Sequence, residues 1–306
     1  MRTKIGFIGL GNLGRNLAGS LVRANFPLTV HDIDEECAAD LVKAGATWAS
    51  SAEATAQASD TVITCLPSPE AVAEVVTGEH GILAGLGRGG TWIDMSTNDS
   101  HELRRLAAVA AERGVTTLEA PVTGGVHRAA AGMITVLVGG DERAFEAHRP
   151  VFEAMGGKVF YIGQLGQASV IKVITNMLAF IHLVADGEAL MLAKRGGIDL
   201  RLAWEVIKAS SGNSFVHETE GQLILNGSYN IHFTMDLVRK DMHFAYQMGR
   251  EFGVPLELAG LTEQIFARAR ALYGGNAQSP MVVKMLEDAV GTDLRAPGFP
   301  AELPPE

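Results

Sequence analysis

Cysteine is scarce in this sequence, which holds Cys37 and Cys65 among its 306 residues. Two cysteines in apolar runs cannot build a disulfide framework, and they do not have the spacing of metal ligands. This argues against a disulfide-rich secreted domain and against a cysteine-based metal site. We therefore expect a protein of the reducing cytoplasm that has no metal centre.

Positive charge is also in short supply. The 25 lysines and arginines are outnumbered by 35 aspartates and glutamates, which gives a formal net charge of −10. A nucleic-acid-binding or anionic-membrane-binding surface needs the opposite balance, so we expect neither kind of partner. A local pocket can still bind a small anion, because its own charge can oppose that of the whole chain.

Aromatic residues make up only 6 %, yet hydrophobic residues reach 47 %, which excludes global disorder. The length is typical of about two domains. A long run with almost no helix breakers, residues 167–195, carries Lys172, Asn176, His182, Asp186 and Glu188, and these polar groups favour a buried helix over a membrane span. The apolar N-terminal stretch is short and glycine-rich, so we interpret it as a strand and a turn rather than a signal peptide.

The first 163 residues alternate between strand-like and helix-like patterns, which predicts a doubly wound α/β domain of the Rossmann type. The predicted strands cover residues 4–8, 28–31, 61–66, 91–95, 115–119, 133–138 and 158–162. The predicted helices among them begin after residue 12 and cover 35–44, 99–113, 126–131 and 142–155.

From residue 164 onward the periodicity is helical only, which predicts an all-α second domain over residues 164–306. The expected helices cover residues 167–195, 200–209, 215–225, 236–252, 256–273 and 281–290. The first of them would join the two domains. The proline-rich stretch after residue 290 has few apolar anchors, so we expect a loose tail over about 291–306.

A glycine-rich turn follows the first predicted strand and opens a helix. Its residues are Gly9, Leu10, Gly11, Asn12, Leu13 and Gly14. In a dinucleotide site of this pattern, the first glycine permits the tight turn, the second lets the pyrophosphate approach, and the third packs helix on strand. The start of the helix supplies N–H groups and a positive dipole end to the phosphates.

Asp32 follows the second predicted strand, 23 residues after Gly9 (32 − 9). Its carboxylate could accept hydrogen bonds from ribose hydroxyls and would repel a 2′-phosphate, and the next residue is Ile33 rather than arginine. We therefore predict NAD in preference to NADP. The turns that contain Leu66-Pro67 and Thr97 also fall at the carboxyl edge of the predicted sheet. They could line the cofactor path or be ordinary turns, as could Ser68.

Two further stretches suggest a substrate site. In Thr123-Gly124-Gly125, consecutive exposed N–H groups before a short helix would suit a carboxylate, although a plain strand-to-helix turn has the same pattern. Lys172 and Asn176 are four residues apart, so they share one face of the long helix. A lysine there could extend to solvent, or it could be a proton-transfer group, since burial lowers a lysine pKa.

Four motifs occur in order: GLGNLG, APVTGGVHRAAAG, GQLGQASVIKVITN and FTMDLVRKD. Together they resemble the β-hydroxyacid dehydrogenase family, which includes 3-hydroxyisobutyrate dehydrogenase and tartronate semialdehyde reductase. The resemblance extends to about Ala289, and the two middle motifs are the specific ones. It implies a Rossmann-type domain joined to a helical domain by a long interdomain helix.

The resemblance also implies roles for individual residues. Lys172 matches the catalytic lysine, and Asn176 matches the asparagine that orients the substrate. Thr123, Gly124 and Gly125 match the substrate-binding turn, where the family usually has serine first. Thr97 matches the nicotinamide-side turn, and Lys240 of the Lys240-Asp241 pair belongs to the cofactor side. Glu119 stands where aspartate is common, a departure that we expect to be mild.

The predicted activity is NAD(P)-dependent interconversion of a short 3-hydroxy acid and its 3-oxo acid, with lysine as general acid and base. It would be most like 3-hydroxyisobutyrate dehydrogenase, with tartronate semialdehyde reductase as the alternative. From another class, a non-catalytic NAD-binding scaffold stays open. We expect a small carboxylic acid as substrate and a homodimer or homotetramer. His127 and Arg128 could reach the substrate or lie in solvent, and His217 and Phe233 could border the pocket from the helical domain.

Overall fold

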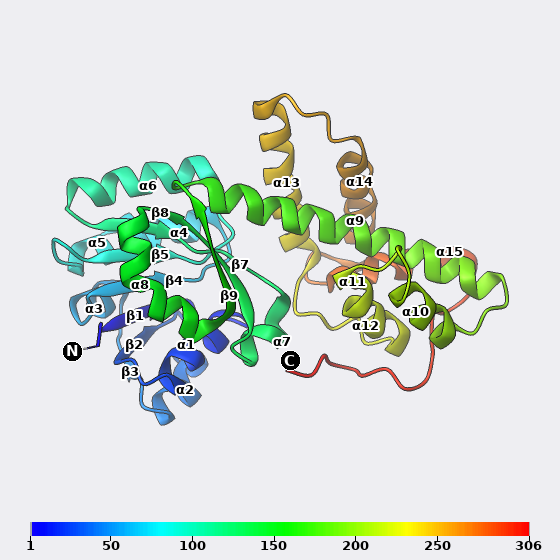
Figure 1. The fold of residues 1–306 in the computed structure, drawn as a ribbon, viewed down its shortest axis with the longest axis horizontal. Helices are drawn as coiled ribbons and strands as arrows, with labels where there is room; N and C mark the ends of the chain where they lie inside the picture. Colours follow the sequence, from blue (N-terminus) through cyan, green and yellow to red (C-terminus); the bar gives the residue numbers. More distant parts are fainter. Residues whose placement is uncertain (1, 306) are drawn as a thin grey trace. The chain divides into compact units, whose positions relative to one another are not determined.

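The computed structural model describes residues 2–305, and its first part is built around one sheet of mostly parallel strands (Figure 1). The strands run in the order β3-β2-β1-β4-β5-β6-β8-β7, and β9 pairs with β8. The strands are β1 (Ile5–Ile8), β2 (Leu28–His31), β3 (Thr47–Trp48), β4 (Thr61–Thr64), β5 (Thr91–Asp94), β6 (Thr116–Glu119), β7 (Val122–Thr123), β8 (Ile134–Gly140) and β9 (Gly156–Gly163).

The strand order is that of a dinucleotide-binding fold. Strands β3, β2, β1, β4, β5 and β6 are parallel to one another, whereas β8 is antiparallel to β6 and β7. The chain order reverses between β1 and β4, and ligands of open α/β sheets bind beyond the carboxyl ends of the strands at such a switch point. The segments that follow β1 and β4, which begin at Gly9 and Cys65, are therefore correctly placed for a cofactor.

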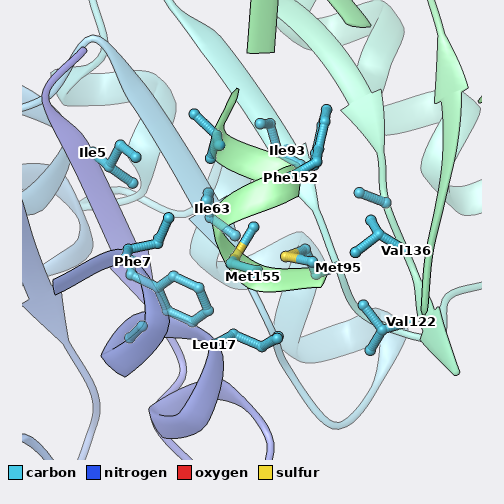
Figure 2. Packing of buried hydrophobic residues seen from close by; sticks show 14 of the residues in the cluster. Ile5, Phe7, Leu17, Ile63, Ile93, Met95, Val122, Val136, Phe152 and Met155 are labelled. Carbon is cyan, nitrogen blue, oxygen red and sulfur yellow. The ribbon is translucent and has the colours of Figure 1, made fainter. Parts of the chain in front are cut away.

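Helices cover both faces of this sheet (Figure 1). They are α1 (Gly14–Arg23), the 3₁₀-helix η1 (Glu35–Ala38), α2 (Ala39–Lys43), α3 (Ala52–Gln57), α4 (Pro69–Thr77), α5 (Ile82–Gly85), α6 (Ser100–Glu112), α7 (Gly125–Ala130) and α8 (Glu142–Met155). Alternate strand residues face opposite layers, as the two-residue repeat of a strand requires. Figure 2 shows one layer, where Phe7, Ile63 and Ile93 pack with Leu17 of α1 and Phe152 of α8.

The second part of the chain is helical. Its elements are α9 (Gln167–Arg195), α10 (Leu200–Lys208), α11 (Phe215–Glu218), α12 (Glu220–Asn226), α13 (Met235–Phe252), α14 (Glu257–Tyr273), the 3₁₀-helix η2 (Ser279–Val282) and α15 (Lys284–Val290). Phe180 of α9 lies in the centre of their core, with its ring 5.8 Å from the rings of both Phe233 and Phe266. The described residues divide into two compact units, 2–172 together with Pro305, and Val173–Pro304, so the division falls inside α9.

Several predicted elements have different limits in the structure. The helix expected over residues 35–44 begins as the 3₁₀-helix η1 and continues as α2. The helix expected over 215–225 is broken at Thr219, whose hydroxyl donates to the carbonyl of Phe215 at 2.8 Å. Such a local bond from a threonine competes with the regular helical pattern. The helix expected over 281–290 begins at Lys284. Residues with weaker patterns, which form α3, α4, α5, β3 and β7, were not predicted.

The prediction of a loose tail after residue 290 is wrong. Leu294 is fully buried, and the guanidinium of Arg295 donates to the buried carboxylate of Glu287 at 2.8 Å. Farther along, the Phe299 ring packs against Trp204 with 5.3 Å between ring centroids. The tail is thus anchored by a few specific contacts, which a sparse apolar pattern does not reveal.

The polarity argument against a membrane span also needs correction. Helix α9 is long and apolar enough to cross a membrane, despite its polar residues. The core helix of a soluble protein passes the same test. Phe180, Leu183, Leu190 and Met191 of α9 lie in the hydrophobic core of the second unit, so we interpret α9 as a core helix.

Candidate functional site

The three glycines in the loop between β1 and α1 differ in the space around them. Gly9 has a positive φ of 96°, and a Cβ on it would lie 2.3 Å from the carbonyl oxygen of Cys65. A Cβ on Gly14 would lie 1.9 Å from the carbonyl oxygen of Gly9. Around Gly11, by contrast, no described atom lies within 4 Å of the Cβ position. The first and third glycines are thus required for packing, whereas the second leaves open space over the backbone.

Helix α1 presents an uncapped N-terminus beside this open space. Within residues 2–305, no side chain forms a cap hydrogen bond at Leu13, and the first turn of α1 has no acidic residue. Like α1, the short helices α2, α5 and α7 have no side-chain cap among the described residues. The other helices before α9 are capped by Ser51 for α3, Ser68 for α4, Asp99 for α6 and Asp141 for α8. An uncapped N-terminus is a binding site for phosphate. The geometry therefore suits the predicted residues Gly9 to Gly14.

Asp32 lies directly after β2, whose last residue His31 is in register with Ile8 of β1. One carboxylate oxygen of Asp32 accepts from the backbone N–H of Leu10 at 2.6 Å, and the other accepts from that of Asp34 at 3.0 Å. The side chain is half-buried, and the adjacent Ile33 is fully exposed. Asp32 thus supports the glycine loop from the side on which a ribose would lie.

The turns after β4 and β5 are joined to each other. The backbone N–H of Leu66 donates to the hydroxyl of Ser96 at 2.9 Å, so Leu66 and Pro67 lie beside the turn that contains Thr97. Ser68 caps α4 by accepting from the N–H of Ala71, which is the ordinary structural role that its position allowed. The predicted residues from these two turns therefore share one edge of the sheet.

Asp94 organises that edge, although none of the sequence motifs pointed to it. It is 1 % exposed at the end of β5 and accepts from the Thr64 hydroxyl at 3.0 Å, the Ser96 N–H at 3.1 Å and the Asn98 side chain at 3.0 Å. Burial raises the pKa of the Asp94 carboxyl, while these donors act in the opposite direction. An aspartate followed by a Ser-Thr-Asn turn is the signal that could have identified it.

The Thr123-Gly124-Gly125 turn has the backbone that its glycines suggest. Gly124 and Gly125 have positive φ values of 122° and 86°, which non-glycine residues rarely adopt. A Cβ on Gly124 would lie 3.2 Å from the Arg128 side chain, and a Cβ on Gly125 would lie 3.0 Å from the His127 ring. Both of these half-buried side chains of α7 therefore lie against the turn rather than extending away from it.

In the second unit, Asp241 of α13 holds Asn176 of α9. The carboxamide nitrogen of Asn176 donates to the Asp241 carboxylate at 2.6 Å, and Asp241 is only 2 % exposed. The Lys240 ammonium lies 3.0 Å from the other Asp241 oxygen and 5.2 Å from the centre of the Phe244 ring. Asp241 thus fixes the orientation of Asn176, a role that its place in the sequence pair did not reveal.

Two residues considered for the substrate pocket have partners within the second unit. Phe233 packs against Phe180 in the core of the second unit, and His217 is 1 % exposed. The His217 ring contacts the carboxylate of Asp186 through Nδ1 and the carbonyl oxygen of Trp204 through Nε2, at 2.5 and 2.9 Å. Burial alone would lower the pKa of His217, but the bond to Asp186 and its charge outweigh burial and raise it.

Lys172 lies near the start of α9 and is 8 % exposed. The backbone N–H groups of Gly166, Ala168 and Ser169, around the start of this helix, donate to the buried carboxylate of Glu119 at the end of β6. A buried lysine is a candidate for proton transfer, since burial favours its neutral form. The structure thus places cofactor-loop residues and Lys172 in the first unit, and Asn176 and Lys240 in the second.

Two family models match consecutive parts of this chain. The NAD binding domain of 6-phosphogluconate dehydrogenase matches residues 4–163, and the domain described as NAD-binding of NADP-dependent 3-hydroxyisobutyrate dehydrogenase matches residues 166–286. The first covers more than half of the chain and includes the glycine loop described above. The chain belongs to the β-hydroxyacid dehydrogenase family. It is accordingly an NAD(P)-dependent hydroxyacid oxidoreductase, as its motifs predicted.

Curated relatives of this family member cover most of its length. It is 33 % identical over 292 residues to 2-(hydroxymethyl)glutarate dehydrogenase of Eubacterium barkeri, covering 95 % of this chain and 97 % of that protein. It is 34 % identical to mitochondrial 3-hydroxyisobutyrate dehydrogenase of Mus musculus, covering 87 % and 81 %. It is 38 % identical to NAD-dependent L-serine dehydrogenase of Pseudomonas aeruginosa, covering 70 % and 72 %.

Solved structures agree with this assignment and confirm the predicted fold class. A complex of Mycobacterium tuberculosis 3-hydroxyisobutyrate dehydrogenase with L-serine superposes with a TM-score of 0.83 at 30 % identity, covering 94 % of this chain and 99 % of that one. Psf3 in complex with NADP⁺ and 2-OPP superposes with a TM-score of 0.86 at 27 % identity, covering 92 % and 99 %.

The open space over Gly11 leads to a test of the cofactor loop. Gly11→Ala should leave stability within about 0.5 kcal/mol of the natural enzyme, because the new methyl group meets no protein atom. It should weaken NADH binding at least about tenfold, or roughly 1.4 kcal/mol, because the methyl group occupies the place of the pyrophosphate. Fluorescence titration with NADH and thermal unfolding measure the two effects.

Gly87→Ala is the matched control, since Gly87 is also exposed and its Cβ position is also free of described atoms within 4 Å. This variant should keep both stability and NADH affinity. An unchanged NADH affinity in Gly11→Ala would contradict the assignment of this loop to the pyrophosphate.

Proposed function

We propose that this enzyme oxidises a hydroxymethyl group that stands next to a carboxylate-bearing carbon, and reduces the corresponding aldehyde. 3-Hydroxyisobutyrate, 2-(hydroxymethyl)glutarate and L-serine, which are named for its relatives, share this fragment and differ only in the third substituent. The proposed reaction is most like that of 3-hydroxyisobutyrate dehydrogenase. The Thr123-Gly124-Gly125 turn would bind the carboxylate through its N–H groups, with the Thr123 hydroxyl as an additional donor.

The observation that carries the proposal is the burial of Lys172, which is 8 % exposed and has the apolar residues Val170, Ile171, Val173 and Ile174 on either side in the sequence. Alcohol oxidation needs a base for the hydroxyl proton, and the bound NAD(P)⁺ supplies the hydride acceptor. We propose that Lys172 Nζ takes the hydroxyl proton during oxidation and returns it to the forming alkoxide during reduction. Asn176, oriented by Asp241, would hold the hydroxyl group in line. Lys240 would contact the cofactor, as would Thr97.

Replacement of Lys172 tests this mechanism. Lys172→Met should lower kcat at least about a hundredfold, the usual size of a general acid–base contribution, and should leave NADH binding nearly intact. The assay follows NADH absorbance with 3-hydroxyisobutyrate, 2-(hydroxymethyl)glutarate, L-serine and D-glycerate as substrates. Oxidation of D-glycerate to tartronate semialdehyde would favour the other predicted activity.

Lys194→Met on the same helix is the control, because Lys194 is exposed in the last turn of α9. It should keep the kcat of the natural enzyme. Retained activity in Lys172→Met would remove this lysine from the mechanism. Binding of NADH without turnover of any hydroxy acid would instead favour the scaffold alternative.

We further propose that NAD is preferred to NADP, because the Asp32 carboxylate supports the loop where a 2′-phosphate would have to be accommodated. The natural enzyme should therefore show the higher kcat/KM with NAD. Asp32→Asn should shift the ratio toward NADP by about fivefold, since two like charges about 4 Å apart in water repel by roughly 1 kcal/mol. Asp40→Asn on the exposed face of α2 should leave the ratio unchanged. A clear NADP preference of the natural enzyme would contradict the role given to Asp32.

We also propose that the protein forms a homo-oligomer through its helical unit. Helix α14 has buried apolar residues in the core, including Phe266, while its Leu258, Leu261 and Leu272 are 58–64 % exposed. Leu261 lies three positions after Leu258 and eleven before Leu272, and both spacings are close to whole helical turns, so the three leucines share one face. A second copy of the chain would remove this surface from water.

The oligomeric state can be measured directly by light scattering after size-exclusion chromatography. We expect the natural protein to run as a dimer or tetramer. Leu258→Glu with Leu261→Glu should yield smaller species, because burying the new carboxylates at an interface is costly. Val42→Glu is the control, since it places a carboxylate on an exposed apolar residue of α2 in the first unit, and it should have no effect. A monomeric natural protein at micromolar concentration would contradict the proposal.

A further inference from the structure

The side-chain carboxylate of Glu119 accepts four hydrogen bonds, and all four donors lie outside its own strand. It is 1 % exposed at the end of β6. Oε1 accepts from the N–H groups of Gly166 and Ala168, at 2.5 and 3.0 Å. Oε2 accepts from the N–H group and the hydroxyl of Ser169, at 2.9 and 2.5 Å. A Cβ on Gly139 would lie 2.4 Å from Oε1, so the absence of a side chain there makes room for the carboxylate.

These donors belong to the beginning of α9, where helical N–H groups have no partner within the helix. A carboxylate is the best acceptor at that end, because it satisfies the N–H groups and interacts favourably with the helix dipole. Burial raises the pKa of the Glu119 carboxyl, whereas the Ser169 hydroxyl and the three backbone donors act to lower it. All four groups that contact the carboxylate are hydrogen-bond donors, and this arrangement suits its ionised form.

The anchored turn is directly followed by the turn that carries Lys172. Lys172 lies three residues after Ser169 and four after Ala168, so it sits on the same face one turn later. Fixing the N–H groups of Ala168 and Ser169 therefore fixes both the axial position and the rotation of the lysine-bearing turn. Proton transfer is sensitive to such placement, since a shift of about 1 Å can cost about a hundredfold in rate.

Glu119 also leads into the turn to which we assign the substrate carboxylate. Ala120 and Pro121 separate β6 from β7, and Thr123 ends β7 four residues after Glu119. The backbone N–H of Ala120 is held by the Asp94 carbonyl at 2.6 Å, which ties the same strand end to β5. One side chain thus joins the carboxylate-binding turn, the sheet edge and the helix of the proposed base.

We propose that Glu119 is a positioning residue that sets the location of Lys172 relative to the Thr123-Gly124-Gly125 turn. This inference rests on the proposed function of these groups. Glu119 itself would not contact the substrate. It would act by holding the first turn of α9 against the end of β6, with Ser169 as the side chain that completes the anchor.

Glu119→Gln tests the inference, because it keeps the shape of the side chain but places an amide nitrogen against N–H donors. We expect kcat to fall at least about tenfold, in line with the cost of misplacing a catalytic group, while KM for NAD stays within about twofold. Amide hydrogen exchange over residues 166–172 should become faster. Ser169→Ala, which removes one of the four donors, should change kcat and exchange in the same direction but less.

Asp141→Asn is the matched control, since Asp141 caps α8 in the same unit by accepting from the Ala144 N–H at 2.8 Å. A merely structural role for Glu119 would make both variants less stable and leave kcat of the folded enzyme unchanged. We expect Asp141→Asn to keep kcat even where its melting temperature falls. Loss of kcat in Glu119→Gln but not in Asp141→Asn would support the positioning role.

The inference is overturned if Glu119→Gln keeps the natural kcat, or if Asp141→Asn loses as much. Should Glu119→Gln fail to fold, Ser169→Ala decides, because an unchanged kcat and unchanged exchange there would overturn the anchor. Failure of the natural enzyme to oxidise any hydroxy acid would contradict the proposed function instead. Exchange over residues 166–172 would still show whether Glu119 holds the start of α9.

Discussion

The bonds from the start of α9 to the buried Glu119 carboxylate are the interaction on which the proposed chemistry most depends. Helix α9 begins with that turn and has 29 residues, among them Lys172 and Asn176. Within the first unit, fixing this turn fixes the axial position and the rotation of the next turn, which carries Lys172. The placement of the proposed base is therefore determined at the end of a four-residue strand.

Buried carboxylates have the same task at the ends of two neighbouring strands. Asp94 and Glu119 are paired in register across β5 and β6, and each accepts hydrogen bonds from a segment beyond the sheet. Asp94 holds the turn that contains Ser96, whereas Glu119 holds the beginning of α9. The start of α1 is different, since no described side chain caps it. The two carboxylates thus fix segments beyond the sheet from inside the protein, whereas the start of α1 has no side-chain cap among the described residues.

The fold could be predicted from the sequence because its signals are local. Glycines at 9, 11 and 14 follow a strand within a few residues, and the spacing to Asp32 is set by one strand-helix-strand unit. The long apolar run likewise corresponds to α9 over residues 167–195. In these places the secondary structure depends on residues that are close together in the sequence. The elements predicted from the sequence pattern therefore agree with those of the structure.

The supporting residues could not be predicted, because their partners are far away in the chain. Glu119 bonds residues 47 to 50 positions later, and Asp241 bonds Asn176 across 65 positions. A single sequence contains no sign of such pairs. The same reason applies to the tail, where Arg295 bonds Tyr229 across 66 positions. The break at Thr219 is different, because the bond from its hydroxyl to the Phe215 carbonyl is local.

The position of the division between the two units has a consequence for how the chain can be cut. The compact units meet between Lys172 and Val173, in the interior of a continuous helix rather than in a loop. Cleavage there would expose unpaired carbonyl groups on one fragment and unpaired N–H groups on the other. Neither half could end at its own boundary without losing backbone hydrogen bonds. The two units are thus separate in their packing but share one continuous helix, so any exchange of one unit at this boundary has to rebuild a helix end.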